Sequence, residues 1–139
     1  GLPLYVLDLN VPFIKNVLAA PHTMRPDELA RHPRAADLRS VSHQTVIGTG
    51  ANRIVLYPVH GEAGERMMLA WLPGRKLLYA SDLVQPIPGG GFGFPEYLTE
   101  VAAVVARHHL AVDKVFAMHT SRPLEWQAIL DAIKKTTSP

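Results

Sequence analysis

Three short segments of the 139-residue sequence place polar side chains directly after apolar runs that are typical of strands. These segments are 58–65 (PVHGEAGE), 78–82 (LYASD) and 115–120 (VFAMHT). Because residues at the ends of neighbouring strands converge on one edge of a sheet, we expect His60, Asp82 and His119 to approach one another there. Imidazole nitrogen and carboxylate oxygen are the usual ligands of zinc and similar divalent metals. The three residues are therefore candidate metal ligands.

Each of these residues also has a simpler interpretation. A single histidine after a strand is more often a capped or solvated side chain than a ligand, and an aspartate before a loop commonly forms an Asx-turn. Glu62 and Glu65 are either a carboxylate pair or the solvated side chains of a turn. Spacing alone leaves the metal site and these interpretations open, because the candidate ligands lie far apart in the sequence.

Other chemistries are excluded by what the sequence lacks. It contains no cysteine, which excludes a disulfide scaffold, a cysteine zinc site and a thiol nucleophile. The glycine-rich stretch 89–94 does not complete G-x-G-x-x-G, and no P-loop lysine follows it. No G-x-S-x-G elbow surrounds Ser81 or Ser121, and H-E-x-x-H is absent.

Composition predicts a globular chain that is one domain, or one half of a larger domain. Apolar residues make up 47% and charged residues 19%, and the net charge is only +2. The richest basic stretch, 25–39, is diluted by acidic residues, so we expect no nucleic-acid partner. No apolar run approaches the roughly 20 residues that a membrane helix needs. No secretory signal is visible either, so we expect a cytoplasmic protein without a membrane partner.

The order of predicted elements indicates a mixed sheet with helices on one face, an α/β fold with an α+β-like sheet. A strand over 4–9, a helix over 12–20 and a helical turn over 26–30 come first, and the abrupt start suggests a chain cut from something longer. Two hairpins follow, 42–47 with 53–59 and 67–72 with 76–80. The segment 67–73 (MMLAWLP) is nearly all apolar, which predicts a central strand covered on both faces.

The last third of the chain predicts a loop and two helices. The glycines of 86–95 indicate a loop without regular structure. A helix begins at Pro95 and another near Pro123, each with apolar residues at i, i+3, i+4 and i+7, and a strand over 115–118 separates them. No linker or repeat interrupts residues 1–139, which we therefore treat as a single domain.

From about Ile54 to Leu130, the sequence resembles the metallo-β-lactamase fold family of metal-dependent hydrolases. Residues 72–83 (LPGRKLLYASDL) look like the strand, turn, strand and metal-bridging aspartate of that family, and 115–119 looks like the strand with its last metal histidine. The family's H-x-H-x-D-H loop has no counterpart here. The resemblance therefore implies the C-terminal half of the family's αβ/βα sandwich.

The resemblance implies a partial metal site, with Asp82 and His119 as ligands of zinc, or of iron or manganese. Where the family carries glycine then histidine, this chain has Gly61-Glu62, so His60 and Glu62 are doubtful ligands. In a complete protein, the metal would activate water for hydrolysis of a small-molecule substrate. The residues Gly89, Gly90, Gly91 and Phe92 would form a substrate loop.

Three hypotheses about function follow. The first is a metal-dependent hydrolase represented by its C-terminal half, inactive alone and without an assignable catalytic residue. The second, which Glu62 favours, is a non-catalytic binding or structural module with a degenerate metal site. The third is an unrelated α/β domain. In the first two, the exposed sheet face predicts a homodimer or pairing with an N-terminal half.

Overall fold

The computed structural model describes residues 2–21 and 23–137 and divides into two compact units. Unit 1 comprises Gly1–Ser42 and unit 2 comprises His43–Pro139. The single domain over residues 1–139 stays a prediction. None of the helices in the described part of the chain is long and apolar enough to cross a membrane.

Unit 1 is a small parallel β-pair joined through two helices. Strand β1 (Leu4–Leu7) pairs with β2 (Leu38–Val41), and α1 (Val11–Ala19) and α2 (Glu28–Arg31) lie between them in the chain. The predicted strand over 4–9 ends early, because 8–10 form a 3₁₀ turn. Strand β2 was not among the predicted strands, and it forms because β1 supplies its hydrogen-bond partners.

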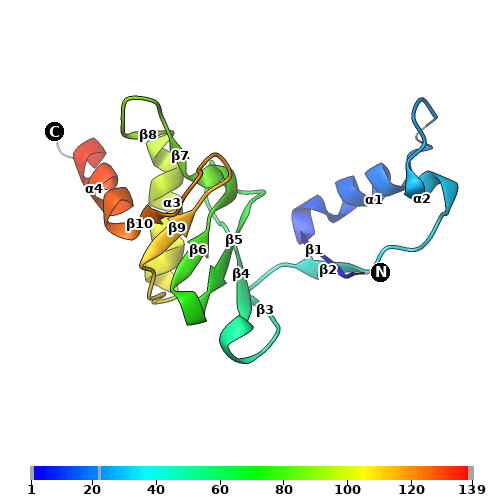
Figure 1. Ribbon diagram of the computed structural model, residues 1–139, viewed down its shortest axis with the longest axis horizontal. Coiled ribbons are helices and arrows are strands. Elements are labelled where there is room, and N and C mark those ends of the chain that lie inside the picture. Colours follow the sequence, from blue (N-terminus) through cyan, green and yellow to red (C-terminus); the bar gives the residue numbers. More distant parts are fainter. Residues whose placement is uncertain (1, 22, 138–139) are drawn as a thin grey trace. The chain divides into compact units, whose positions relative to one another are not determined.

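Unit 2 contains, among the described residues, a six-stranded mixed sheet in the order β10-β9-β6-β5-β4-β3 (Figure 1). Only β6 and β9 pair in parallel, and the other neighbours are antiparallel. Both predicted hairpins are confirmed, as β3–β4 and β5–β6. The strands are β3 (Thr45–Ile47), β4 (Ile54–Pro58), β5 (Met68–Leu72), β6 (Leu77–Tyr79), β9 (Lys114–Phe116) and β10 (Leu124–Glu125).

The glycine-rich segment after β6 is a hairpin, which corrects the prediction of a loop without regular structure. Strands β7 (Gln85–Pro86) and β8 (Phe92–Gly93) pair antiparallel. The Ile87 amide donates to the Gly91 carbonyl oxygen at 3.3 Å and closes the turn. The three consecutive glycines 89–91 all have positive φ, a conformation that glycine adopts without steric cost.

Two helices cover one face of the sheet. Helix α3 (Pro95–Arg107) begins at the predicted proline, whereas α4 (Trp126–Thr137) begins three residues after Pro123. The delay arises because Leu124–Glu125 pair with β9 as β10 before the helix starts.

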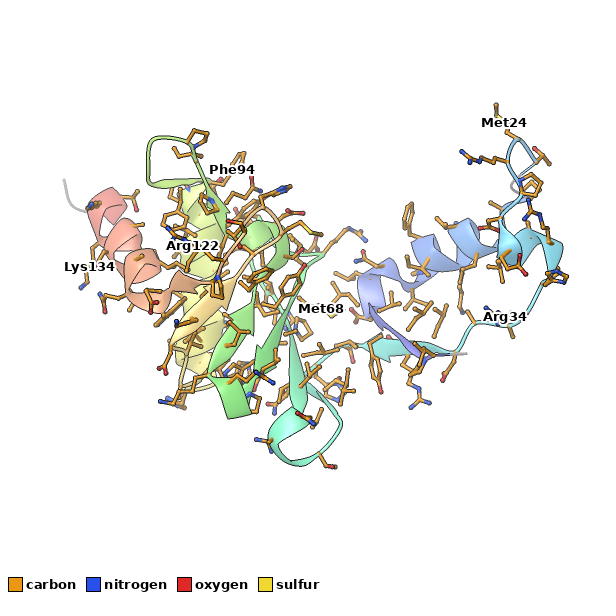
Figure 2. All side chains as sticks on the ribbon, viewed as in Figure 1. Met24, Arg34, Met68, Phe94, Arg122 and Lys134 are labelled. Carbon is orange, nitrogen blue, oxygen red and sulfur yellow. The ribbon has the colours of Figure 1, made fainter. Side chains whose placement is uncertain are left out.

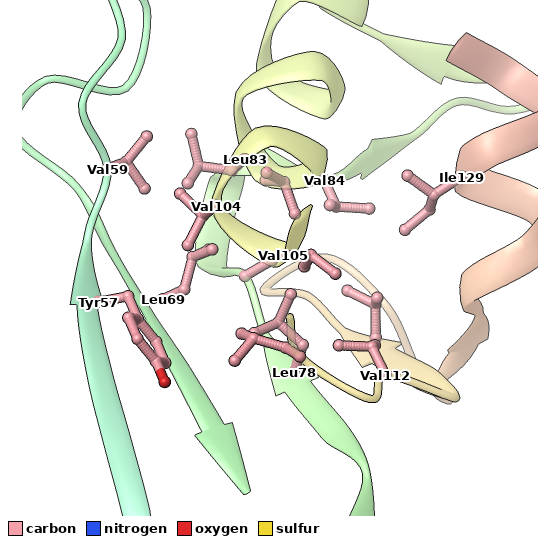
Figure 3. Close-up of a cluster of buried hydrophobic side chains, with 14 of the residues drawn as sticks. Tyr57, Val59, Leu69, Leu78, Leu83, Val84, Val104, Val105, Val112 and Ile129 are labelled. Atoms are coloured by element: carbon pink, nitrogen blue, oxygen red, sulfur yellow. The ribbon is translucent and has the colours of Figure 1, made fainter. Parts of the chain in front are cut away.

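The core of unit 2 lies between the sheet and these helices. Leu69 of β5 and Leu78 of β6 meet Val105 of α3 and Ile129 of α4 there (Figure 3). Leu69 is the one fully buried residue of β5, and the other four are half-buried, so the prediction of cover on both faces is met within unit 2 on one face only. Within unit 2, the helices cover only the face to which Leu69 belongs.

Candidate functional site

Asp82 and His119 meet at one edge of the sheet. Strands β6 and β9 are parallel neighbours, so their C-terminal ends lie side by side. Asp82 follows β6 in a 3₁₀ turn (Ser81–Leu83), and His119 follows β9. Asp82 Oδ1 and His119 Nε2 lie 3.0 Å apart, with 45% and 67% of the two side chains exposed. The structure thus brings two of the three predicted residues into contact.

Backbone hydrogen bonds beyond the ends of the two strands hold this pair in place. The Ala80 amide donates to the Phe116 carbonyl oxygen at 2.9 Å, and the Met118 amide donates to the Ser81 carbonyl oxygen at 3.1 Å. Ser81 has a φ of +46°, which is uncommon for a residue with a side chain. The Thr120 hydroxyl donates to the Ala117 carbonyl oxygen at 2.9 Å and closes the turn that carries His119.

His60 and Glu62 do not join this pair. Strand β4 ends at the same sheet edge, but β5 separates it from β6. Across residues 2–21 and 23–137, no group of three or more His, Cys, Asp or Glu side chains is placed to hold a metal ion. Glu62 instead borders an open surface hollow of about 630 Å³ that it shares with Ala63 and with Glu96, Thr99 and Glu100 of α3.

Glu100 is a residue of this region that the sequence did not reveal. Its Oε1 accepts a hydrogen bond from the Ala63 amide at 2.9 Å, and its Oε2 accepts one from the Gly64 amide at 2.7 Å. The two glycines of the loop, Gly61 and Gly64, are the weak sign in the sequence that another element packs closely against it. In the structure, a Cβ at either position would clash with the Glu100 side chain. Sequence spacing does not connect a loop with a helical residue 36 positions later.

Another histidine, His108, packs against an aromatic ring at the C-terminal end of α3. The His108 ring contacts the Tyr57 ring, with centroids 4.5 Å apart. Desolvation lowers the pKa of His108 below its usual value, and the charges of Arg107, His109 and His60 lower it further. Burial raises the pKa of Tyr57. His60 therefore lies within electrostatic reach of His108.

Comparison with known proteins gave matches among solved structures only. No family model and no curated protein matches the chain. A metallo-β-lactamase from Pontibacter korlensis matches with a TM-score of 0.60 at 13% identity, over 96% of this chain and 57% of that one. The rubredoxin oxygen:oxidoreductase of Desulfovibrio gigas matches with a TM-score of 0.61 at 11% identity, over 96% of this chain and 36% of that one.

An archaeal metallo-β-lactamase superfamily protein from Sulfolobus tokodaii matches with a TM-score of 0.53 at 12% identity, over 91% of this chain and 50% of that one. The chain has the metallo-β-lactamase fold. The fold prediction is therefore confirmed. The chain spans about half the length, or less, of these solved structures.

The Asp82–His119 pair fits two ligands of one divalent metal within this metallo-β-lactamase fold. Asp82 Oδ1 is shielded from solvent and has His119 Nε2 as a polar neighbour at 3.0 Å, although the Asp82 side chain as a whole is 45% exposed. Two ligand atoms about 2.0–2.2 Å from a tetrahedral zinc ion lie about 3.3–3.5 Å apart. The observed separation of 3.0 Å would have to widen by a few tenths of an ångström to admit the ion. Tight zinc sites use three or four ligands, so the pair amounts to half a site.

The predicted substrate loop follows Asp82 closely in the chain. The side-chain amide of Gln85, at the start of β7, donates to the Asp82 carbonyl oxygen at 2.8 Å. Ile87, in the turn of the hairpin, is 48% exposed. Phe94, between the hairpin and α3, is 53% exposed (Figure 2). Its glycine tip gives it the backbone freedom of a mobile loop. The role of Gly89–Phe92 in substrate binding stays a prediction.

Proposed function

We propose that this chain is the C-terminal half of a metal-dependent hydrolase of the metallo-β-lactamase superfamily, with Asp82 and His119 as metal ligands. The observation that carries the proposal is the 3.0 Å separation of Asp82 Oδ1 and His119 Nε2 at the ends of parallel strands, with Oδ1 shielded from solvent. Zinc is the first candidate, because it accepts both imidazole nitrogen and carboxylate oxygen. Iron and manganese suit such donors as well.

A divalent metal held here would supply an activated water and would polarise the bond to be hydrolysed. The residues of this chain would bind and orient it, because backbone hydrogen bonds fix both ligand-bearing turns. The remaining ligands and the group that holds the attacking water would come from the other half of the fold. A small-molecule substrate would lie beside the glycine hairpin. We therefore expect no hydrolysis by this chain alone.

The second face of the sheet supports the pairing of two halves. Leu56, Ala70, Tyr79 and Phe116 stand in one cross-strand row, on the face opposite the helices of unit 2. A hollow of about 320 Å³ lies on this face, and its lining includes Leu56, Met68, Ala70 and Tyr79. An apolar face of this kind normally has a partner. We propose that the complementary half of the fold, a second sheet layer with an apolar face, covers it.

A non-catalytic module with a degenerate site is the second candidate. It is favoured by the small number of ligands, because no third metal-binding side chain joins Asp82 and His119 among the residues that the structure describes. It is also favoured by Glu62, because this residue stands where the family resemblance places a histidine ligand. In the structure, Glu62 borders the hollow over α3.

Metal binding by purified protein tests the ligand assignment. Zinc, iron and manganese contents are measured by equilibrium dialysis and elemental analysis on the wild type, Asp82→Ala and His119→Ala. We expect a metal to bind the wild type, and each variant to weaken binding by more than the roughly tenfold that loss of an outer-shell partner costs. His109→Ala, an exposed histidine near the end of α3, is the matched control and should bind as the wild type does.

Two results would contradict the proposal: a wild type that binds no metal, or equal binding by all four proteins. Metal binding without hydrolysis of lactams, thioesters, lactones or phosphodiesters by the complete protein would favour the non-catalytic module.

A further inference from the structure

The loop between β4 and β5 is tied to helix α3 through one carboxylate. Both oxygens of Glu100 accept backbone hydrogen bonds, from the amides of Ala63 and Gly64. This is the loop in which the family resemblance places a glycine and a metal-binding histidine. We propose that Glu100 anchors the loop in place of a metal ion, so that the loop keeps its conformation without metal and contributes no ligand.

The fit around the carboxylate is close. A Cβ added at Gly64 would lie 2.8 Å from Glu100 Oε2, 2.9 Å from Val59 Cγ1 and 3.1 Å from Leu83 Cδ2. A Cβ at Gly61 would collide with the Glu100 carboxylate. The loop therefore rests on three elements at once: the end of β4, the residue after Asp82, and α3. Hydrogen bonds to an ionised acceptor are stronger than neutral ones, so a single side chain suffices to hold the turn.

The anchored loop carries Glu62, which does not form a metal-binding group with the Asp82–His119 pair among the described residues. Glu62 lies between Gly61 and Ala63, and its side chain is exposed. It borders the same hollow as Glu96 and Thr99 of α3, and neither Asp82 nor His119 lines that hollow. Within residues 2–21 and 23–137, the proposed metal half-site thus consists of Asp82 and His119. This conclusion rests on the proposed function, whereas the anchoring of the loop by Glu100 does not.

Amide hydrogen exchange measured by NMR tests the anchor. The proteins are the wild type, Glu100→Gln, which keeps the shape of the side chain but loses its charge and one acceptor, and the control Glu96→Gln, one turn earlier on the same helix. Each is measured with and without zinc. We expect slow exchange at Ala63 and Gly64 in the wild type in both conditions, and at least about tenfold faster exchange in Glu100→Gln. Leu69 and Leu78, buried in the core, should exchange equally slowly in all three proteins.

Three outcomes would overturn the anchor. The first is unchanged exchange at Ala63 and Gly64 in Glu100→Gln. The second is faster exchange at Leu69 and Leu78 by the same factor, which would mean general destabilisation. The third is wild-type protection that arises only when zinc is added, which would make the loop a metal-binding segment and leave the proposed function standing. A wild type that binds no zinc but shows the expected exchange would support the anchor and contradict the proposed function.

Discussion

Ser81 combines a left-handed backbone with a position directly before a candidate ligand. Its φ is +46°, and its carbonyl oxygen accepts the Met118 amide hydrogen bond that links the two ligand-bearing turns. A side chain in this conformation costs about 1–2 kcal/mol, and a β-branched one costs more. We predict that Ser81→Val lowers the free energy of unfolding by about 1–3 kcal/mol, whereas Ser81→Gly maintains it or raises it by up to about 1 kcal/mol.

Urea unfolding of both variants measures the effect, with Ser121→Val as the control. Ser121 is exposed and is not among the described residues with positive φ, so valine should change its stability little. Equal losses at the two serines would contradict a special backbone requirement at Ser81.

At the scale of single residues, the sequence located Asp82 and His119 because each directly follows an apolar run. It could not exclude His60 and Glu62 from the same set, because only the strand order of the structure places β5 between β4 and β6. Glu100 and Ser81 were missed for physical reasons. The role of Glu100 depends on a contact across 36 positions, and that of Ser81 on a dihedral angle that serine seldom adopts.

The fit between the β4–β5 loop and α3 gives a prediction at the scale of elements. Gly61→Ala places a methyl group against the Glu100 carboxylate, and we expect it to lower the free energy of unfolding by about 1–3 kcal/mol. The same substitution should cost less in a Glu100→Ala background, because the clashing atoms are gone. Chemical denaturation of the four proteins of this double-mutant cycle measures the difference.

Gly93→Ala is the control for that cycle, because a Cβ there would meet only ordinary contacts, the nearest being Ile87 Cγ2 at 3.5 Å. If Gly61→Ala costs the same with and without Glu100, the loop is not fitted to this side chain.

Elements with a strong local pattern were predicted well, and elements that depend on a partner were not. The β3–β4 and β5–β6 hairpins and helix α3 carry their own turn, cap and periodicity signals. Strands β7, β8 and β10 have two residues each, too few to show a period, and they form because a neighbour supplies hydrogen bonds. The apolar pattern of β5 correctly indicated a central strand. It did not show what covers each face, because the pattern reports which faces can be buried and not what buries them.

At the scale of the whole molecule, the proposed complementary half would account for one feature of the fold and one feature of the candidate site. The chain matches 57% of the Pontibacter korlensis enzyme. Its sheet in unit 2 has helices on one face only, and its candidate metal site has two ligands. One complementary half of the fold would supply a cover for the sheet and the further ligands together. This is why we propose that a single partner both covers the sheet face and supplies the further metal ligands.

The apolar sheet face gives the prediction that tests this view. Without its complementary half, the chain should bind a hydrophobic dye and pair with a second copy through the row that contains Ala70 and Phe116. Ala70→Glu and Phe116→Glu should each reduce dye fluorescence and shift the chain towards monomer in sedimentation velocity, because either places a charge in the contact. Ala103→Glu, exposed on α3, should leave both unchanged. A monomeric wild type that binds no dye would mean that this face is already covered and needs no second sheet layer.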